Sequence, residues 1–440
     1  SAKITRSFVA RTQASAGGNA HAIDVQEGGS LELVESSVAL NVGQGVSVDL
    51  KSTAAVTRSI VRDTLENPSG NDGHGVEVLG GSKVTLEDSV LLGNHEVALN
   101  TGGKGTVVEA TRTHVVETSS STKGGFGVAA GAQSGAHLTF KDGMVARAFY
   151  YGFFADGRGS LVEIERALVS DVRVIDKLGR CLDVQSGATM SARDSTVQKC
   201  GTDGVVVDGQ GGEATFSADH LLVQRTSSTG VFGRQGGKAT LTASAVIEAT
   251  EVGVYTSNTT SPEGRRCDFT LDRSVVRATR ATKDGVNGAG VVSGGTVHLV
   301  GTTLAGNHAF AAASAGEGAF MDLTGSVLRD SVAEPKDDAF GHGLVGLDHA
   351  TLRLTDCDVV GNARVGAAFQ NVSVVIRRSR ITRNQVGLHV QGDSRLAEVP
   401  GAPDTAEPNE VAVTTDTRLD GNETKLGSGF VPLPKVSVGQ

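Results

Sequence analysis

The sequence predicts an all-β solenoid in which short coils of three strands stack on one another. Three observations support this prediction: a motif that recurs along nearly the whole chain, apolar residues that alternate with period two inside each copy, and 59 glycines among 440 residues that separate the apolar runs. Charged residues make up 20% and hydrophobic residues 38% of the chain, which is ordinary for a folded protein. The glycines therefore mark turns within a folded structure.

The recurring motif is clearest in the segment from Gly75 to Asn94, GVEVLGGSKVTLEDSVLLGN. It begins with Gly and alternating Val, passes through a Gly-Gly turn, and continues with a Val-x-Leu run, a Ser-Val-Leu run and an Asn. Further copies follow at intervals of about 21 to 37 residues. Close copies begin at Ala22, Gly204, Gly230, Gly290 and Gly343, and looser copies begin near Gly45, Glu96, Gly127, Gly152, Cys181, Gly253, Ala311, Gly366 and Gly387.

Each copy contains three period-two apolar runs, which predict three strands and no helix. A repeat this short cannot bury its own apolar face, so neighbouring copies must stack and share a core. We expect about fifteen to sixteen coils over residues 1–422, spaced by ~4.8 Å, and a non-repetitive tail or linker over residues 423–440. Val76 and Leu86 are examples of the predicted core.

Several copies end in Asn at an equivalent place. Asn tolerates left-handed backbone, and its amide can bond to the equivalent residue one coil away, so we interpret these residues as structural. They are Asn41, Asn94, Asn307, Asn362, Asn384 and Asn422.

The motif has a known counterpart. The order Ser-x-Val-x-x-Asn-x-x-x-Gly-Val, in the segment that ends at Val46, resembles the pectate-lyase-like and NosD-like carbohydrate-associated repeat families. The resemblance covers almost all of residues 1–422 and implies a single-stranded right-handed parallel β-helix. It implies no single activity, because that fold carries lyases, hydrolases, epimerases, adhesins and inert scaffolds.

Charge and cysteine usage exclude several classes of protein. A net charge of −9 gives no electrostatic reason to bind nucleic acid, and no apolar stretch approaches the ~20 residues that cross a bilayer. The four cysteines have no zinc-site spacing and RTX-type calcium repeats are absent, so we expect no cofactor. Cys181 and Cys200 can form one disulfide at most. The chain starts at Ser1 directly in a predicted strand, which suggests the middle of a longer protein.

The residue two positions after each motif start is expected to point outward, so these residues form a row along one face of the predicted solenoid. This row is largely apolar, and its acidic members Asp24, Glu77 and Asp183 are each at least one coil apart, which argues against paired-carboxylate catalysis. The row is Asp24, Ser47, Glu77, Ala98, Ala129, Phe154, Asp183, Val206, Phe232, Tyr255, Val292, Ala313, Val345, Ala368 and His389.

The residues just before the starts form a second row, in which His95 is expected to stack on His74, followed by Phe126 and Tyr151. Two imidazoles near Glu77 and other carboxylates can bind a divalent metal or serve as a general base. The simpler interpretation is a solvated ladder of turn residues. His74, His95 and Glu77 are therefore the candidate catalytic residues, and His74 and His95 the candidate metal ligands.

Aromatic residues mark a possible ligand surface. Five of the 17 aromatic residues lie between Phe149 and Phe154, a pattern typical of a sugar-binding platform or, alternatively, of a wide core. The candidate binding residues are Phe126, Tyr151, Phe154, Phe232 and Tyr255.

Together these patterns favour a secreted or cell-surface structural and adhesive module that recognises a glycan or a protein through edge loops and an apolar face. The alternative is a polysaccharide lyase, hydrolase or epimerase with a site near His74 and His95. Monomers rarely expose a long apolar band, so we expect the C-terminal tail to cover part of it and a side-by-side homo-oligomer to cover the rest. The expected band is Phe154, Val206, Phe232, Tyr255, Val292 and Val345.

Overall fold

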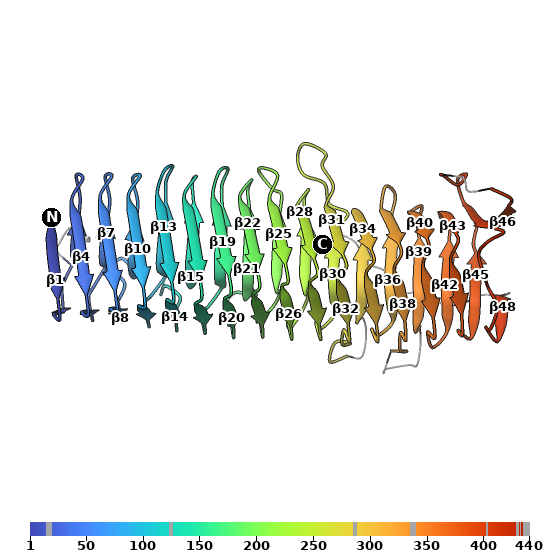
Figure 1. The fold of residues 1–440 in the computed structure, drawn as a ribbon, viewed down its shortest axis with the longest axis horizontal. Helices are drawn as coiled ribbons and strands as arrows, with labels where there is room; N and C mark the ends of the chain where they lie inside the picture. The colour runs from blue at the N-terminus through green and yellow to red at the C-terminus, as the bar shows by residue number, and fades with distance from the viewer. Residues whose placement is uncertain are drawn as a thin grey trace. The chain divides into compact units, whose positions relative to one another are not determined.

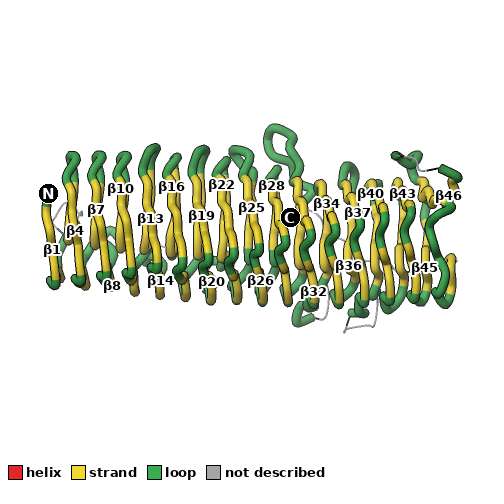
Figure 2. The backbone as a smooth tube through the Cα atoms, viewed as in Figure 1, coloured by secondary structure: helices red, strands yellow, loops and turns green. Residues whose placement is uncertain are grey.

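Each coil of the protein is made of three strands that join three parallel sheets, here named A, B and C in chain order. The computed structural model describes residues 1–14, 20–122, 126–284, 288–334, 340–401, 404–427, 431 and 433. The chain divides into unit 1 (Ser1–Ser217) and unit 2 (Ala218–Gln440). Both units are right-handed parallel β-solenoids, and no helix occurs among the described residues (Figure 2). The predicted fold is confirmed, and among the described residues sheet B has 15 strands and sheet C has 16.

In unit 1 the strands of each sheet lie side by side in sequence order (Figure 1). Sheet A contains β1 (Ala2–Thr5), β4 (Ser30–Val34), β7 (Thr53–Thr57), β10 (Lys83–Glu87), β13 (Val107–Thr111), β16 (His137–Lys141), β19 (Leu161–Glu165) and β22 (Thr189–Arg193). Sheet B contains β2 (Phe8–Ala10), β5 (Ser37–Ala39), β8 (Ile60–Arg62), β11 (Val90–Leu92), β14 (His114–Val116), β17 (Met144–Ala146), β20 (Leu168–Ser170) and β23 (Thr196–Gln198). Sheet C contains β3 (His21–Val25), β6 (Gln44–Val48), β9 (His74–Val78), β12 (Val97–Gly102), β15 (Val128–Gln133), β18 (Tyr151–Asp156), β21 (Arg180–Gln185) and β24 (Val205–Asp208).

Unit 2 repeats the arrangement, and β25 (Thr215–Asp219) contains the boundary. Its sheet A contains β28 (Lys238–Thr242), β31 (Asp268–Asp272), β34 (Thr296–Val300), β37 (Phe320–Thr324), β40 (Thr351–Thr355), β43 (Ser373–Arg377), β46 (Arg395–Val399) and β47 (Glu410–Thr414). Sheet B contains β26 (Leu222–Gln224), β29 (Ala245–Ile247), β32 (Val275–Arg277), β35 (Thr303–Ala305), β38 (Val327–Arg329), β41 (Asp358–Val360) and β44 (Arg380–Thr382). Sheet C contains β27 (Val231–Arg234), β30 (Val252–Thr256), β33 (Ala289–Ser293), β36 (Phe310–Ala315), β39 (His342–Leu347), β42 (Val365–Gln370), β45 (Val386–Gln391) and β48 (Thr424–Gly427).

The core lies inside the coils and follows the predicted alternation. In β10, Val84 and Leu86 are buried while Lys83, Thr85 and Glu87 are exposed. Equivalent positions of neighbouring strands pair with one another, so buried residues form continuous rows. One such row is Leu33, Val56, Leu86, Ala110 and Phe140.

The corner between sheets B and C is built around the repeated Asn. Asn94 is fully buried; its Nδ2 donates to the carbonyl of Val61 at 3.0 Å, and its Oδ1 accepts the N–H of Thr64 at 3.2 Å. In unit 2, Asn362 Nδ2 donates to Asn384 Oδ1 at 3.0 Å. The structural interpretation of these residues is confirmed.

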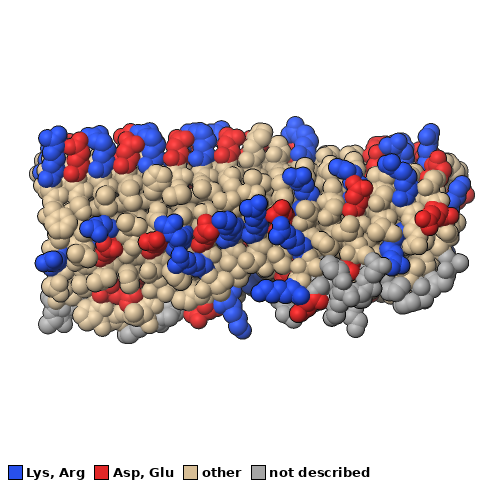
Figure 3. Space-filling view, turned by 90° about the horizontal axis from the view of Figure 1, so that it is seen from below, with Lys and Arg blue, Asp and Glu red and all other residues tan. Residues whose placement is uncertain are grey.

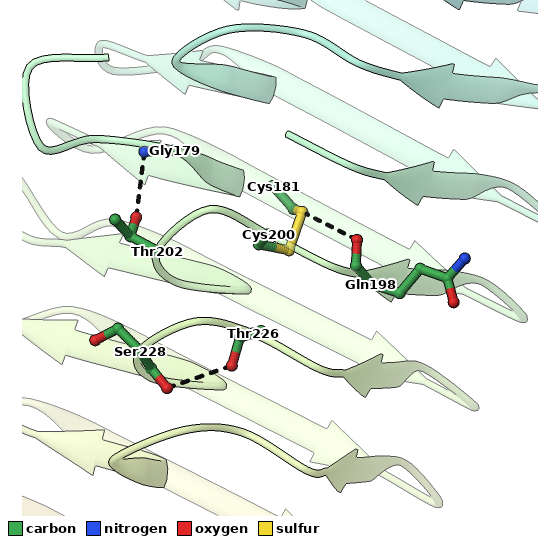
Figure 4. The surroundings of a disulfide bond; sticks show 7 residues. All are labelled: Gly179, Cys181, Gln198, Cys200, Thr202, Thr226 and Ser228. Carbon is green, nitrogen blue, oxygen red and sulfur yellow. Dashed lines mark hydrogen bonds between the residues drawn. A yellow bond between two sulfur atoms is a disulfide. The ribbon is translucent and has the colours of Figure 1, made fainter. Parts of the chain in front are cut away.

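The other half of that corner is a small residue at the start of the sheet C strand. A Cβ on Gly75 would lie 2.8 Å from Asn94 Nδ2, so the Asn amide fills the space that a side chain would need. In one coil a disulfide between Cys181 and Cys200 takes the place of this Gly–Asn pair (Figure 4). Its Cα atoms are 5.5 Å apart and its sequence separation of 19 residues equals that of Gly75 and Asn94.

The corner between sheets A and B in unit 1 carries a row of charges whose sign alternates from coil to coil. Figure 3 shows it as alternating blue and red side chains along one edge. Glu35 accepts from both neighbours, from Arg6 Nε at 2.8 Å and from Arg58 Nη2 at 3.0 Å. Each exposed ion pair stabilises the fold only slightly. If a coil paired with the coil after its neighbour, however, two like charges would lie side by side, so the row favours the native order of the coils. The row is Arg6, Glu35, Arg58, Asp88, Arg112, Asp142, Arg166 and Asp194.

Each strand of sheet C has two outward-facing positions, so the sheet carries two outward rows of side chains. The period-two alternation of inward and outward residues is interrupted near the start of these strands. Most residues of the predicted outward row do lie together, as shown by the pairings Ser47 with Glu77 and Phe154 with Asp183. Ala98 and Ala129 do not: Asn100 and Gly131 hold those places.

The predicted stacking of His95 on His74 and of Phe126 on Tyr151 is wrong. Val97 pairs with Val128, which pairs with Tyr151, so these valines occupy the row. The physical reason is the register of β12: Leu99, and not Val97, is in register with Val76, so the predicted start near Glu96 lies two residues too early and His95 lies before the strand, at a bridge to Ser119.

The predicted apolar band is covered at three of its six residues. Val206, Val292 and Val345 are at most 4% exposed although their side chains point away from the coil interior. In unit 2, Leu433 packs against the band. The tail residues 428–430, 432 and 434–440 lie outside the described residues.

Candidate functional site

The outer surface of sheet C in unit 1, here called face C1, brings most of the candidate residues together. It consists of outward side chains of β3, β6, β9, β12, β15, β18 and β21 and is bordered by the connections between sheets B and C. Equivalent positions of neighbouring strands lie side by side, and the residues at these positions differ from coil to coil. Chemically different side chains therefore become neighbours on this face.

A buried polar cluster occupies face C1 around His74. His74 Nδ1 lies 2.9 Å from Glu77 Oε1, and His74 Nε2 lies 3.8 Å from Glu96 Oε2. Asn100 Nδ2 donates to Glu77 Oε1 at 3.0 Å, and Gln44 Nε2 donates to Glu77 Oε2. Both carboxylate oxygens of Glu77 are therefore bonded.

The electrostatics of this cluster favour a charged imidazolium and a charged carboxylate. Burial lowers the pKa of His74, but the hydrogen bond to Glu77 and the charges of Glu77, Glu96 and Asp72 outweigh burial and leave that pKa raised. Burial raises the pKa of Glu77, but the hydrogen bond and charge of His74 and the amide of Asn100 leave it lowered. The His74 and Glu77 side chains are only 10% and 9% exposed. This geometry is typical of a shielded ion pair.

Replacing His74 by Gln is expected to lower the melting temperature more at pH 5.5 than at pH 8.5. A raised folded pKa stabilises the fold fully below the unfolded value of 6.5, and the contribution is lost as pH rises through the folded pKa. The lowered pKa of Glu77 keeps its contribution above roughly pH 4.5. Thermal melts of both chains at the two pH values, with the exposed His114→Gln as control, measure the difference. Equal losses at both pH values would contradict the ion pair.

His95 belongs to a separate contact that holds the border of face C1. Its Nδ1 lies 3.2 Å from Glu66 Oε1, and Glu66 also accepts the N–H of Thr122 at 2.8 Å and the Thr122 hydroxyl. The N–H of Asp72 donates to Glu96 at 2.6 Å. The two imidazoles thus bond to different carboxylates, and no group of three His, Cys, Asp or Glu among the described residues has the arrangement of a metal site.

An aromatic cluster occupies the next part of face C1. The ring centroids of Phe126 and Tyr150 are 5.6 Å apart, those of Tyr150 and Tyr151 4.4 Å, and Tyr151 and Phe154 stack at 5.1 Å with an interplanar angle of 3°. Phe126 is 48% exposed and Tyr151 only 4%. Tyr150 and Phe154 are half-buried. The structure therefore brings the candidates Phe126, Tyr151 and Phe154 together.

Beside the aromatic cluster lies a second shielded ion pair. Arg180 Nη1 is 2.6 Å from Asp183 Oδ2, and Gln185 Nε2 donates to Asp183 Oδ1 at 2.6 Å. Arg180 and Asp183 pair in register with Tyr151 and Phe154. Burial, followed by the charge of Asp183, raises the pKa of Tyr151 far above its ordinary value, so the phenol remains a proton donor at neutral pH.

The other two binding candidates lie in unit 2. Phe232 and Tyr255 stack with centroids 5.1 Å apart and an interplanar angle of 3°. Burial raises the pKa of Tyr255 to about 12. These two rings are therefore a separate pair in the outward row of unit 2.

The amide groups of face C1 were not among the residues predicted from the sequence. Gln133 Nε2 donates to Asn100 Oδ1 at 3.0 Å, and Gln133, Asp156 and Gln185 align in one row. The signal was present in the sequence, because each lies at the end of an outward-facing run in successive copies of the motif.

Comparisons with known proteins give no family. No family model and no curated protein matches the sequence. The structure is similar to the A-module of mannuronan C-5 epimerase AlgE4 from Azotobacter vinelandii, with 12% identity, a TM-score of 0.37, and coverage of 90% of this chain and 91% of that one. It is also similar to the AlgE6 A-module from the same organism, with 12% identity, a TM-score of 0.34, and coverage of 83% and 90%. These values are too low to assign an activity.

Proposed function

We propose that face C1 binds an extended carbohydrate chain that runs across the strands. The observation that supports this proposal most directly is the half-buried aromatic cluster of Phe126, Tyr150 and Phe154 beside the amides of Gln133 and Gln185. Sugar rings offer apolar C–H faces and peripheral hydroxyl groups. Aromatic rings pack against the first, and amides donate to and accept from the second.

The repeat of the solenoid suits a polymeric ligand. Successive sheet C strands are spaced by ~4.8 Å, which is comparable with the length of one sugar residue in an extended chain. In a polysaccharide that lies across β12 to β21, each sugar unit would therefore contact the equivalent outward position of the next strand. Repeat proteins commonly use such extended surfaces for recognition.

Binding without chemistry accounts for the charged groups of face C1. A general base needs access to substrate and a pKa near the working pH. His74 and Glu77 instead neutralise each other, as do Arg180 and Asp183, and all four are buried. We therefore propose an adhesive or structural module as the first candidate function.

A polysaccharide-processing enzyme is the second candidate. It is favoured by the buried phenol of Tyr151, whose strand pairs in register with Arg180, because a proton donor beside a guanidinium suits reaction at an acidic sugar. We also propose an extracellular or cell-surface location. It is supported by the Cys181–Cys200 disulfide, since disulfides persist in oxidising compartments.

Replacing Phe154 by Ala is expected to weaken binding to the recognised polysaccharide about tenfold, because one stacking interaction contributes roughly 1–1.5 kcal/mol beyond burial. Affinity electrophoresis through a panel of neutral and acidic polysaccharides measures this, with Phe232→Ala in unit 2 as the matched control. Unchanged retention of the Phe154 variant, or no retention of the native chain by any polymer, would refute the proposal. New reducing ends or unsaturated uronates that disappear in Tyr151→Phe would establish the enzyme instead.

A further inference from the structure

The outer surface of sheet C in unit 2, here called face C2, is apolar although it points away from the coil interior. Its buried members are one cluster, and Tyr255, Val252 and Phe340 pack around it. The cluster consists of Ala289, Val292, Ala309, Phe310, Ala313, Ala315, Val345 and Leu347.

The coils do not require this composition. Inside the same strands a separate core is closed by Val291, Ala312 and Leu344, each fully buried. The outward row that holds Val292 and Val345 in unit 2 holds Glu77 and Asp183 in unit 1. The fold therefore accepts charged residues in this row. The apolar residues of face C2 are not needed to close the coil, which indicates that they contact a group outside it.

The C-terminal segment contacts face C2 at two points. Leu433 packs against the apolar cluster, and the N–H of Val431 donates to Gln391 Oε1 at 3.0 Å. Gln391 is held in place for this bond, because its Nε2 donates to Gln370 Oε1 at 2.8 Å and its Oε1 lies 2.9 Å from His389 Nε2.

The two contacts differ in kind. The bond to Val431 uses backbone and fixes the position of the segment, while Leu433 supplies the apolar side chain. Gln391 belongs to β45 and most of the cluster to β33, β36 and β39, so the two contacts lie on different strands of sheet C.

We propose that face C2 is a peptide-docking site whose occupant is this chain's own Val431–Leu433 segment, bound to the same molecule that carries it. Gln391 recognises the backbone and the apolar cluster receives the leucine. Because the inner core is complete without the segment, the segment can dissociate while the coils stay closed. The occupied site keeps an apolar surface from solvent and from other chains.

The test uses the full chain with Leu433→Asp, and Leu426→Asp as the matched control, since Leu426 is 49% exposed in β48. Leu433→Asp is expected to raise the fluorescence of an apolar-sensing dye at least threefold, while Leu426→Asp leaves it unchanged. A synthetic peptide of residues 428–440 should then bind the Leu433→Asp chain saturably and reverse the dye signal. A peptide that itself carries Leu433→Asp should bind at least tenfold more weakly.

A second variant tests the receiving surface. Gln391→Leu removes the oxygen that accepts the N–H of Val431 at a half-buried position, and should raise the dye signal as Leu433→Asp does while circular dichroism stays native. Equal dye signals in Leu433→Asp and Leu426→Asp, or no peptide binding, would overturn the docking site. A native chain that sediments as a dimer and becomes monomeric on Leu433→Asp would place the segment on a second copy and overturn docking within one molecule.

Discussion

Replacing Leu86 by Asp is expected to unfold the coils around β10 in unit 1. Leu86 is 1% exposed and is in register with Val56 and Ala110, so the new carboxylate would lie between two apolar neighbours with no hydrogen-bond partner. An unpaired buried charge costs several kcal/mol, which is a large part of the ~5–15 kcal/mol that stabilises a typical domain. Val76→Asp, at a fully buried position of β9, should have the same effect.

Chemical unfolding and limited proteolysis measure this loss, and Thr85→Asp is the matched control. Thr85 is the preceding residue of the same strand and is exposed, so its replacement introduces the same charge into the same backbone without burying it. The control should change the free energy of unfolding by less than about 1 kcal/mol. A Leu86→Asp chain with unchanged unfolding and cleavage would mean that β10 faces the other way.

The coil architecture was predictable because its determinants are local and repeated. The alternation of apolar and polar residues predicts which side chains of a strand point inward. Each coil also packs against copies of the same motif, so an unclear copy can be aligned with clearer ones. The Asn corners were predictable for the same reason, since the Asn of one coil bonds to backbone of the adjacent one, as Asn94 does to Thr64.

The candidate site was less predictable, because it depends on connections that do not repeat. The copy near Glu96 is loose and lacks the starting Gly, so its start was placed two residues too early, whereas Leu99 is the residue in register with Val76. His74 and Glu77 were named from two different rows of the motif, and the structure places their side chains 2.9 Å apart. Their shielding, however, depends on the non-repetitive connections around face C1, as when Glu66 bonds to His95 and Thr122.

Two other features show a sequence signal of different strength. The apolar band and its partial cover by the tail were both expected from the sequence, and in unit 2 Leu433 packs against the band. The alternating charges at the corner of sheets A and B carried a clear periodic signal, in which Arg58 and Asp88 occupy equivalent places with opposite sign. That signal emerges only when the residue after each sheet A strand is compared across copies.

The Cys181–Cys200 disulfide occupies a corner that other coils close without a covalent bond. Cys181 holds the place of Gly75 and Cys200 that of Asn94, so the bridge is the covalent form of a contact the fold already uses. In the chain-entropy model, a closed loop of this length restricts the unfolded chain by about 3 kcal/mol. The cross-link also joins the end of sheet B to the start of sheet C within one coil, where no ladder bond connects them.

Replacing both cysteines by Ser is therefore expected to lower the free energy of unfolding by about 2–4 kcal/mol. Serine at both positions removes the covalent bond and does not supply the hydrogen bonds that an Asn amide forms at this corner. Replacing Cys181 by Gly and Cys200 by Asn should lose less, because the new amide can bond to backbone as Asn94 does. Chemical denaturation with and without reductant measures both variants, and Cys357→Ser, which removes a buried free thiol, is the control. Two results would contradict this interpretation: a native chain that is as stable with reductant as without it, or a Gly–Asn variant that is no more stable than the Ser–Ser variant. Either result would mean that the disulfide is not equivalent to the Gly–Asn contact of the other coils.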